Sequence, residues 1–506
     1  MIESGAHSAG GGSGTRPADR PMAYTDKITK QGAPLALSIL GGGIAGLSAG
    51  HFARKKGLRF RIYEAGETVG GNCRTFEHEG FFYDSGAHRF HDKDPEMTRE
   101  LRDLLGDELG EIRAPSQICH EGRFIDFPLS PLNLVRKLGA ATLTKAAFEL
   151  VRARLSRRGP RDDFEAFALH TYGRTIAELF LLGYSRKLWG MPPERLSPVI
   201  SGGRLKGLTI SAFLFEAFGG KRKRTRHLDG SFYYPRHGIR VIPERLAESC
   251  GRENILTGSR ITRVFHDARG IRAVEVNGRE RVATGGVINT LPLSVFVGLL
   301  DPVPPPEVLA SAGRLGFRDL VLIALFLDRP SLSKNASIYF PDAGLPFARL
   351  YEPKNRSRFM APPDRTAVVV ECPCFRDDAV WSAPDGRLVD TVRGHLARLG
   401  LIREPEVLGG TVARLEYAYP VIESGTEAKT QEIFGYLERF ENLRSSGRVA
   451  LFEYIHIHDI MRIGQEIVEG MSRVDGGRPL GDPEELEQPL DVHPPFVGVQ
   501  GEKAAQ

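Results

Sequence analysis

The sequence predicts a mixed α/β fold in which a Rossmann-like domain is interrupted by a helical insertion and a β-rich domain. An apolar run at residues 35–40 opens into a glycine-rich turn and a helical stretch, and a second apolar run follows at 60–63. Residues 133–158 have a helical pattern, whereas the chain beyond Pro306 is rich in strand-like runs. The composition is that of a globular protein, with 41% hydrophobic and 26% charged residues among 506.

The order of these patterns predicts a discontinuous dinucleotide-binding domain. Its pieces are expected at residues 35–125, 235–300 and 440–475. A helical insertion at 126–234 and a β-rich substrate domain at 301–439 would separate the pieces. Residues 1–34 contain many Gly and Ser but no apolar run, so we expect a disordered leader there, and residues 476–506 are expected to form a tail.

Charge, cysteine content and hydropathy exclude several classes of protein. The chain has 68 basic and 63 acidic residues, a net charge of +5, which favours a small anionic substrate and does not predict nucleic-acid binding. Five sparse cysteines argue against a secreted domain stapled by disulfides. No apolar stretch is long enough to cross a bilayer and no secretory signal is evident, so the cytoplasm is the expected compartment. The oligomeric state stays open.

The glycine-rich turn after the first apolar run has the features of a dinucleotide-binding site. Gly41 would permit the tight turn, Gly43 a close approach of a pyrophosphate, and Gly46 close packing of the helix on the strand. The start of the helix would direct backbone N–H groups and its positive dipole end at the phosphates. Glu64, at the end of the second run, would accept hydrogen bonds from ribose hydroxyls. The alternative is a glycine-rich turn in another kind of α/β protein.

The segment after Glu64 indicates which dinucleotide binds. Residues 64–75 (EAGETVGGNCRT) resemble the extension that follows the second strand in the superfamily of FAD-dependent amine oxidases and protoporphyrinogen oxidases. In that superfamily a glycine pair, here Gly70 and Gly71, continues the cofactor cradle along the flavin's phosphates. The resemblance implies that the cofactor is FAD and that the Rossmann-like domain is an FAD-binding domain of the GR2 type.

Six short segments, in the same order along the chain, resemble UDP-galactopyranose mutases within that superfamily. They are Gly70-Gly71-Asn72, GAHRFH at 86–91, GYSRKLWG at 183–190, ARLYEPK at 348–354, Tyr419-Pro420, and the stretch from Gly447-Arg448 to Tyr454. The resemblance implies that His88 lies beside the isoalloxazine and that Arg349 grips a substrate diphosphate. It also implies pocket positions near the substrate for Tyr419 and along the flavin for Arg448.

These segments define the candidate site residues. The expected cofactor-binding residues are Gly41, Gly43, Gly46, Glu64, Gly70, Gly71, Asn72, His88 and Arg448. The expected substrate-binding residues are Tyr184, Trp189, Arg204 and Arg349. The expected catalytic residues are His88, Arg349, Tyr419 and Tyr454. A guanidinium fork suits phosphate and a neutral imidazole suits a flavin edge, whereas surface arginines, a structural histidine and core aromatic side chains are the alternatives.

Tyr184 and Trp189 are expected in a loop after a helix, where they would line a sugar or aromatic pocket. Other positions depart from the mutase pattern. The mutases carry two arginines around a proline after the Trp-Gly pair, whereas residues 203–207 (GRLKG) retain only Arg204. Where the mutases have acidic residues after the final tyrosine, this chain has His456 and His458, which strand-like alternation would place on one side.

These departures indicate a pocket that is not built for the standard mutase substrate. Residues 232–238 (FYYPRHG) also resemble the glycine-containing turn of the oxidases more than the mutase loop. No metal site is expected, because only Asp459 accompanies the two histidines at ligand spacing.

Two functions fit these observations. The first is an FAD-dependent oxidoreductase, in which hydride passes between flavin N5 and an anionic biosynthetic intermediate such as a nucleotide- or lipid-linked sugar. The second, implied by the six segments, is a mutase-like isomerase in which reduced flavin acts as a nucleophile without net redox change. We place the oxidoreductase first, because mutase residues are missing and redox chemistry is the commoner use of the superfamily. A flavin-binding protein without catalysis is the third alternative.

Two basic segments fall outside the candidate site. Residues 221–227 (KRKRTRH) are predicted to form a solvated loop, with an anion-gathering rim of the site as the alternative. The basic amphipathic stretch 136–158 is predicted to be an ordinary helix of the insertion, and a peripheral contact with an anionic membrane surface stays open.

Overall fold

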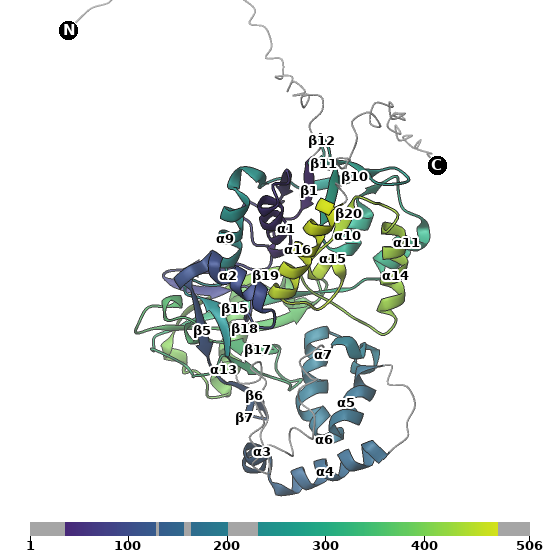
Figure 1. The fold of residues 1–506 in the computed structure, drawn as a ribbon. Helices are drawn as coiled ribbons and strands as arrows, with labels where there is room; N and C mark the ends of the chain where they lie inside the picture. The colour runs from purple at the N-terminus through teal and green to yellow at the C-terminus, as the bar shows by residue number, and fades with distance from the viewer. Residues whose placement is uncertain (1–35, 128–130, 156–162, 201–230, 474–506) are drawn as a thin grey trace, which may run out of the picture. The chain divides into compact units, whose positions relative to one another are not determined.

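The computed structural model describes residues 36–127, 131–155, 163–200 and 231–473 (Figure 1). All of them belong to one compact unit, Leu35–Asp482. The predicted leader at 1–34, the tail at 476–506, the basic run at 221–227 and the candidate residue Arg204 lie outside the described residues.

A five-stranded parallel sheet brings together three separated stretches of the chain. Its strand order is β20 (Leu443–Ser445), β13 (Gly286–Asn289), β1 (Leu37–Leu40), β2 (Phe60–Tyr63) and β9 (Ile255–Leu256). On the central strand β1, Leu37 pairs with Phe60 of β2 and with Gly286 of β13. All four residues of β1 are buried, because helices cover both faces of the sheet. The parallel sheet with its helices confirms the predicted α/β class (Figure 1).

The two faces of this sheet carry different layers. One face packs on α1 (Ile44–Lys55), α2 (Pro95–Leu105), α9 (Val241–Cys250) and α16 (Ile457–Arg473). The other packs on α10 (Leu293–Gly298), α11 (Pro306–Gly313), α14 (Thr426–Leu437) and the sheet β12 (Glu280–Ala283), β11 (Ile271–Val276), β10 (Ile261–His266), β14 (Leu300–Asp301). Successive side chains of β1 point to opposite faces of the sheet, so Ile39 joins the first core and Leu40 joins the second.

A seven-stranded, mostly antiparallel sheet makes up most of the β-rich part. Its order is β19 (Val407–Pro420), β15 (Phe317–Leu327), β18 (Thr366–Cys374), β17 (Arg349–Tyr351), β16 (Ser337–Tyr339), β6 (Ser116–His120) and β7 (Arg123–Phe127). The long apolar run predicted at 320–327 lies in β15, whose alternate residues feed two cores on opposite faces. On one of these faces α13 (Asp385–Arg398) supplies Leu388 and Val392.

One strand pair departs from the predicted ranges. Residues up to 125 were expected in the dinucleotide-binding domain, but β6 pairs in parallel with β16, with Ser116 opposite Ser337. The hairpin of β3 (Thr75–His78) and β4 (Phe81–Asp84) also packs against the seven-stranded sheet, since Phe81 belongs to one of the cores of that sheet.

The helical insertion supplies one wall of the site described below. Its helices are α3 (Pro131–Leu138), α4 (Ala140–Leu155), α5 (Phe164–Tyr172), α6 (Arg174–Ala177), a π-helical turn (Glu178–Leu182) and α7 (Gly183–Trp189). Tyr184 and Trp189, predicted in a loop, lie instead within α7, which ends when Gly190 adopts a left-handed φ of 70°. His456 and His458, predicted in a strand-like run, lie just before and within α16 because Asp459 accepts the His456 backbone N–H at the helix start.

The remaining elements are short. They are α12 (Ala379–Ser382), α15 (Arg448–Leu451), the strand pair β5 (Leu109–Arg113) and β8 (Ser231–Pro235), and 3-10 turns at Gly106–Glu108, Pro193–Arg195, Arg252–Asn254, Pro353–Asn355, Arg358–Met360 and Glu404–Glu406. Among the described residues, none of the helices combines the length and the apolar character that a membrane span requires.

Candidate functional site

The glycine-rich turn between β1 and α1 leaves open space at the start of the helix. Gly41 has a φ of +105°, and a Cβ added to Gly46 would lie 1.9 Å from the carbonyl oxygen of Gly41. Gly43 is the N-cap of α1 and no side chain caps the helix there. The first N–H groups of α1 therefore face this turn without a side-chain acceptor, which is the arrangement that binds phosphate in dinucleotide sites.

A second glycine pair closes against the first turn. The Gly70 N–H donates to the Gly42 carbonyl at 2.9 Å. A Cβ on Gly71 would lie 3.2 Å from the Cα of Gly43, and both Gly70 and Gly71 have positive φ. Side chains at these positions would fill the space in front of α1. The two turns thus make a cradle lined by backbone, which fits the pyrophosphate of FAD.

Glu64 and Asn72 flank the cradle. The Glu64 carboxylate accepts the Gly42 N–H and the Gly66 N–H, each at 2.7 Å. It therefore orders the first turn, besides its predicted role toward a ribose. Asn72 donates its side-chain amide to the carbonyls of Glu416 (3.2 Å) and Tyr417 (3.3 Å), and so ties the cradle to β19.

His88 lies among positive charges. Its Nε2 is 3.2 Å from the Ser85 hydroxyl, which in turn donates to the Asn72 carbonyl at 2.6 Å. Burial lowers the pKa of His88 to about 3, and the guanidinium groups of Arg448, Arg349 and Arg356 add to the shift. The imidazole is therefore neutral at physiological pH and acts there as a hydrogen-bonding group rather than as an acid.

The charge state of His88 gives a testable pH dependence. The pKa of His88 is about 3 in the folded chain, compared with an ordinary value of 6.5 in the unfolded chain. As the pH drops below 6.5, the unfolded chain therefore binds a proton that the folded chain does not, and the stability of the folded chain falls. Between pH 7 and pH 5 the wild type should lose up to about 2 kcal/mol more unfolding free energy than His88→Gln. Urea unfolding at both pH values, with FAD held constant, measures this difference. Equal losses would contradict the assignment.

An internal ion pair orients Arg349. Its Nε donates to Glu371 Oε2 at 2.7 Å, across the register of β17 and β18. The other carboxylate oxygen accepts the Ala87 N–H at 2.8 Å. The side chains are only 14% and 3% exposed. Glu371 therefore joins the arginine to the segment that carries His88.

Three of the predicted aromatic residues form a cluster, and Arg448 lies against two of its rings, those of Tyr419 and Tyr454. The ring centroids of Trp189 lie 6.2 Å from Tyr419 and 5.9 Å from Tyr454, both in edge-on geometry. The Arg448 guanidinium lies 4.9 Å from the Tyr454 ring centroid and donates twice to the Ile455 carbonyl. Helix α7, strand β19 and the turn after α15 thus meet in one aromatic wall that carries a cation.

Tyr184 occupies the same region from the helical side. Its ring meets Tyr339 edge-on at 5.5 Å. Burial raises the pKa of Tyr184, and burial raises that of Tyr419 to about 12 beside Glu371, so both phenols stay protonated. Trp189 is 3% exposed and its ring belongs largely to a core. The Trp189 ring therefore supports the aromatic wall by packing and leaves little surface for contact with a substrate.

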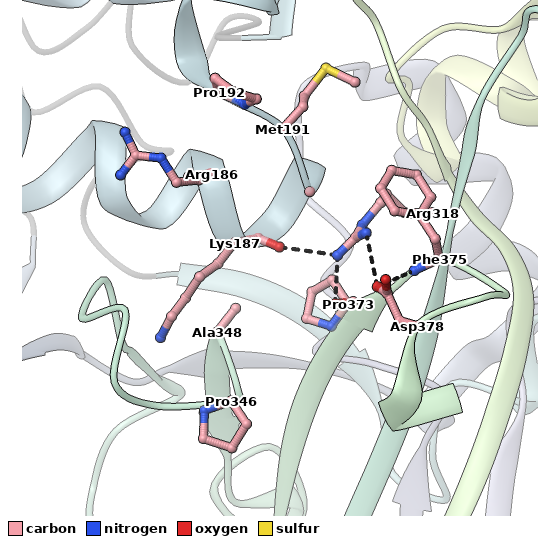
Figure 2. Close-up of a pocket in the computed structure, with 11 residues that line it drawn as sticks. Arg186, Lys187, Met191, Pro192, Arg318, Pro346, Ala348, Pro373, Phe375 and Asp378 are labelled. Atoms are coloured by element: carbon pink, nitrogen blue, oxygen red, sulfur yellow. Dashed lines mark hydrogen bonds and ion pairs between the residues drawn. The ribbon is translucent and has the colours of Figure 1, made fainter. Parts of the chain in front are cut away.

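A cavity of about 450 Å³ opens at the C-terminal end of α7 (Figure 2). Its lining consists of Arg186, Lys187, Gly190, Met191, Pro192, Arg318, Pro346, Ala348, Pro373, Phe375 and Asp378. None of these is among the predicted site residues, although Ala348 and Gly190 adjoin Arg349 and Trp189 in the sequence. The charged side chains of the lining are three cations and one carboxylate, so the cavity favours an anion.

Arg318 and Lys187 shape this cavity. Arg318 donates to the carbonyls of Lys187 and Leu188 at the end of α7, and its guanidinium approaches Asp378 at 3.6 Å (Figure 2). Lys187 donates to the carbonyls of Phe340 and Phe347, and burial lowers its pKa to about 8. Both side chains hold α7 against the seven-stranded sheet.

Sequence reasoning missed Glu371, Lys187 and Arg318 as members of this site. Glu371 ends an apolar run as Glu64 does, and that signal was available. Lys187 lies in the GYSRKLWG segment that resembles the mutases, although no role was assigned to it. The role of Arg318 depends on carbonyls from distant segments, and nothing near residue 318 indicates it.

Arg204 lies outside the described residues. The His456 and His458 rings are stacked at 5.7 Å, and His456 is 5.8 Å from Tyr454, so they adjoin the wall. In the described part of the chain no three His, Cys, Asp or Glu side chains could hold a metal ion together.

Comparison with known families identifies the type of protein. The family model described as flavin containing amine oxidoreductase matches residues 44–427. Protoporphyrinogen oxidase 1 of Arabidopsis thaliana, a chloroplastic protein, is 26% identical over 292 residues, which are 52% of this chain and 54% of that protein. Protoporphyrinogen oxidase of Nicotiana tabacum, also chloroplastic, is 24% identical over 54% of this chain and 53% of its own length. The chain thus spans about half the length of the curated relatives that it matches.

Solved structures share the fold. Reduced UDP-galactopyranose mutase superposes with a TM-score of 0.76 at 20% identity, covering 90% of this chain and 97% of the other. A putative protoporphyrinogen oxidase from Exiguobacterium superposes with a TM-score of 0.70 at 17% identity, covering 88% and 100%. These likenesses support the FAD-dependent oxidoreductase and mutase fold over nearly the whole described chain.

Proposed function

Because the chain belongs to the family of flavin-containing amine oxidoreductases, we propose that it is an FAD-dependent oxidoreductase whose substrate is an anionic biosynthetic intermediate. FAD, when bound, supplies the acceptor for a hydride from the substrate. The residues that would hold it are Gly41, Gly43, Gly46, Glu64, Gly70, Gly71, Asn72, His88 and Arg448.

The observation that carries this proposal is the charge of the site. The pKa of the partly buried His88 is lowered by the positive charges of three arginines, Arg349, Arg356 and Arg448. The adjoining cavity adds Arg186 and Lys187. Glu371 offsets the charge of Arg349, but Arg448, Arg186 and Lys187 keep an excess of positive charge. This excess would favour carboxylate or phosphate groups over a cationic amine, the substrate type in the family's name.

The chain's own residues have distinct tasks in this proposal. Arg349, oriented by Glu371, would bind an anionic group of the substrate through its guanidinium fork. Tyr419 and Tyr454 would form the wall against which the substrate lies and would exclude water. His88, being neutral, would hold a hydrogen bond without supplying a proton. The cavity beside α7 would receive the outer anionic part of the substrate.

A mutase-like isomerisation is the second candidate. The aromatic wall of Trp189, Tyr419 and Tyr454 beside Arg349 supports it, since these residues come from the segments that resemble the mutases. The good superposition on UDP-galactopyranose mutase adds fold-level support. His456 and His458 count against it, because acidic residues follow the final tyrosine in the mutases.

The test distinguishes the two reactions by the flavin's redox state. Oxidised holoenzyme is mixed without oxygen with protoporphyrinogen, UDP-galactose or an aliphatic diamine, and the loss of oxidised flavin absorbance is followed. In parallel, dithionite-reduced enzyme is incubated with UDP-galactose, and sugar ring isomers are separated by chromatography. Bleaching by an anionic compound supports the oxidoreductase, and isomers without bleaching would replace it with the mutase. Bleaching by the diamine alone would contradict an anionic substrate.

A matched pair of variants tests the cavity. Arg186→Gln removes an exposed cation of the lining and should raise KM for an anionic substrate about five-fold with kcat unchanged. Arg99→Gln removes an exposed arginine on α2 and should leave both constants unchanged. Equal effects of the two variants would exclude the cavity from substrate binding.

A further inference from the structure

Strand β19 is irregular just before the residue that it contributes to the aromatic wall. Four steps along β19, from Leu415 to Tyr419, face only two steps along β15, from Leu320 to Arg318. Within this stretch Tyr417 has a φ of +53°. A bulky side chain adopts this left-handed conformation only where its surroundings enforce it, and such positions are common at functional sites.

A buried carboxylate holds this irregular stretch, residues 416–418, which we call the β19 bulge. Asp319 of β15 accepts the Tyr417 N–H at 2.8 Å, and its side chain is only 6% exposed. Arg376 donates to the same carboxylate at 2.8 Å and pairs with Glu416 at 3.1 Å. Asp319 therefore supplies a hydrogen bond at the residue whose φ is unfavourable, and this bond offsets part of the strain.

The β19 bulge is also tied to the FAD cradle. Asn72, which follows the second glycine pair, donates its side-chain amide to the carbonyls of Glu416 and Tyr417. Both carbonyls belong to the bulge, so the cradle meets β19 at its irregular residues. The bulge is thus held from the cradle side by Asn72 and from the sheet side by Asp319.

Tyr419 lies directly after the β19 bulge. Its ring centroid is 6.2 Å from that of Trp189 and 6.2 Å from that of Tyr454. One residue separates Tyr419 from Tyr417. A change in the backbone of Tyr417 would therefore displace the Tyr419 ring relative to its two aromatic neighbours.

We propose that Asp319 is a positioning residue, which fixes Tyr419 in the aromatic wall by holding the β19 bulge. Bulges of this kind re-aim side chains next to active sites. Asp319 acts through the Tyr417 backbone and not through contact with a substrate. The importance of the wall for a substrate rests on the proposed function, whereas the position of Tyr419 does not.

Tryptophan fluorescence measures the position of Tyr419 without a substrate. The chain has two tryptophans, so Trp381→Phe leaves Trp189 as the one indole emitter. Trp189 is 3% exposed and lies against Tyr419. In holoenzyme that carries Trp381→Phe, Asp319→Ala should shift the emission maximum to longer wavelength, because the bulge relaxes, Tyr419 moves and water reaches the indole. An error in the proposed reaction leaves this measurement unaffected, since no substrate is added.

A rescue experiment separates positioning from a general loss of stability. Glycine adopts a positive φ without strain, so Tyr417→Gly should restore the emission maximum in the Asp319→Ala protein. Tyr417→Ala removes the same ring but keeps the unfavourable φ, and it should not restore the maximum. If Asp319→Ala alone does not fold, the same pair still decides, because only Tyr417→Gly should restore flavin content and a cooperative unfolding transition.

Two further variants serve as controls. Asp319→Asn keeps an oxygen that can accept the Tyr417 N–H, and it should shift the emission maximum less than Asp319→Ala. Asp267→Ala removes another carboxylate that pairs with an arginine and accepts backbone N–H groups, those of Arg269 and Gly270 at 2.9 Å. It should leave the emission maximum unchanged.

Three results would overturn the proposal. They are an unchanged emission maximum in a folded Asp319→Ala protein, no difference between Tyr417→Gly and Tyr417→Ala in the Asp319→Ala background, and an equal shift caused by Asp267→Ala.

Discussion

Replacing Gly46 with alanine is expected to give a protein that no longer retains FAD. A Cβ at this position would lie 1.9 Å from the carbonyl oxygen of Gly41 and 3.2 Å from Ile39. The first contact is with backbone, so it is not relieved by a rotamer change, and α1 must move away from β1. We expect destabilisation by more than about 3 kcal/mol, because the shift disrupts a fully packed layer. The ratio of flavin absorbance to protein absorbance and a urea unfolding curve measure both effects.

The chain offers a matched control for this substitution. Gly435 lies within α14, and a Cβ there would meet nothing within 4 Å. Gly435→Ala should therefore retain FAD fully and gain up to about 1 kcal/mol from helix propensity. A Gly46→Ala protein with full flavin content and wild-type stability would show that the turn does not have the described geometry.

Removal of the Glu371 carboxylate is expected to be nearly as damaging. Glu371→Ala leaves the guanidinium of Arg349 buried without its partner and the Ala87 N–H without its acceptor. Breaking a buried ion pair from one side costs about 3–5 kcal/mol, because the remaining charge is not solvated. The melting temperature of the variant should lie well below that of the wild type. The affinity for an anionic substrate should also fall, since Arg349 loses its orientation.

Two further variants separate charge from geometry at Glu371. Glu371→Gln keeps an acceptor for the Ala87 N–H and should lose less stability than Glu371→Ala. Glu423→Ala breaks an ion pair with Arg195 whose side chains are 24% and 62% exposed, and it should cost less than about 1 kcal/mol. If Glu371→Ala and Glu423→Ala destabilise the protein equally, the pair with Arg349 does not hold the site together.

These two positions differ in how far the sequence alone predicted them. The steric role of Gly46 follows from the spacing of three glycines within six residues, because the turn and the helix start are local backbone features. The pairing of Glu371 with Arg349 depends on the register of β17 and β18. That register is decided by side-chain packing on the two faces of the sheet and leaves no mark in either segment alone.

The same distinction applies to the fold. The α/β class and the strands β1 and β2 of the central sheet were predicted from short apolar runs and a glycine-rich turn. The parallel pairing of β6 with β16 joins residues more than two hundred positions apart, and nothing near residue 116 indicates it. Tyr184 and Trp189 were predicted in a loop after a helix, whereas the helix continues to Trp189 and only Gly190 ends it.

The sequence by itself therefore determined the α/β class and the glycine-rich cradle for FAD, whereas the residues that would meet the substrate stay a prediction. Each of these rests on backbone geometry within a few residues, or on motifs with their own spacing. The tertiary structure decided which cations face His88, which carboxylate orients Arg349, and which carboxylate accepts the Tyr417 N–H in the β19 bulge. These features depend on which distant surfaces pack together, because burial and ion pairing are properties of neighbours in space and not of neighbours in the chain.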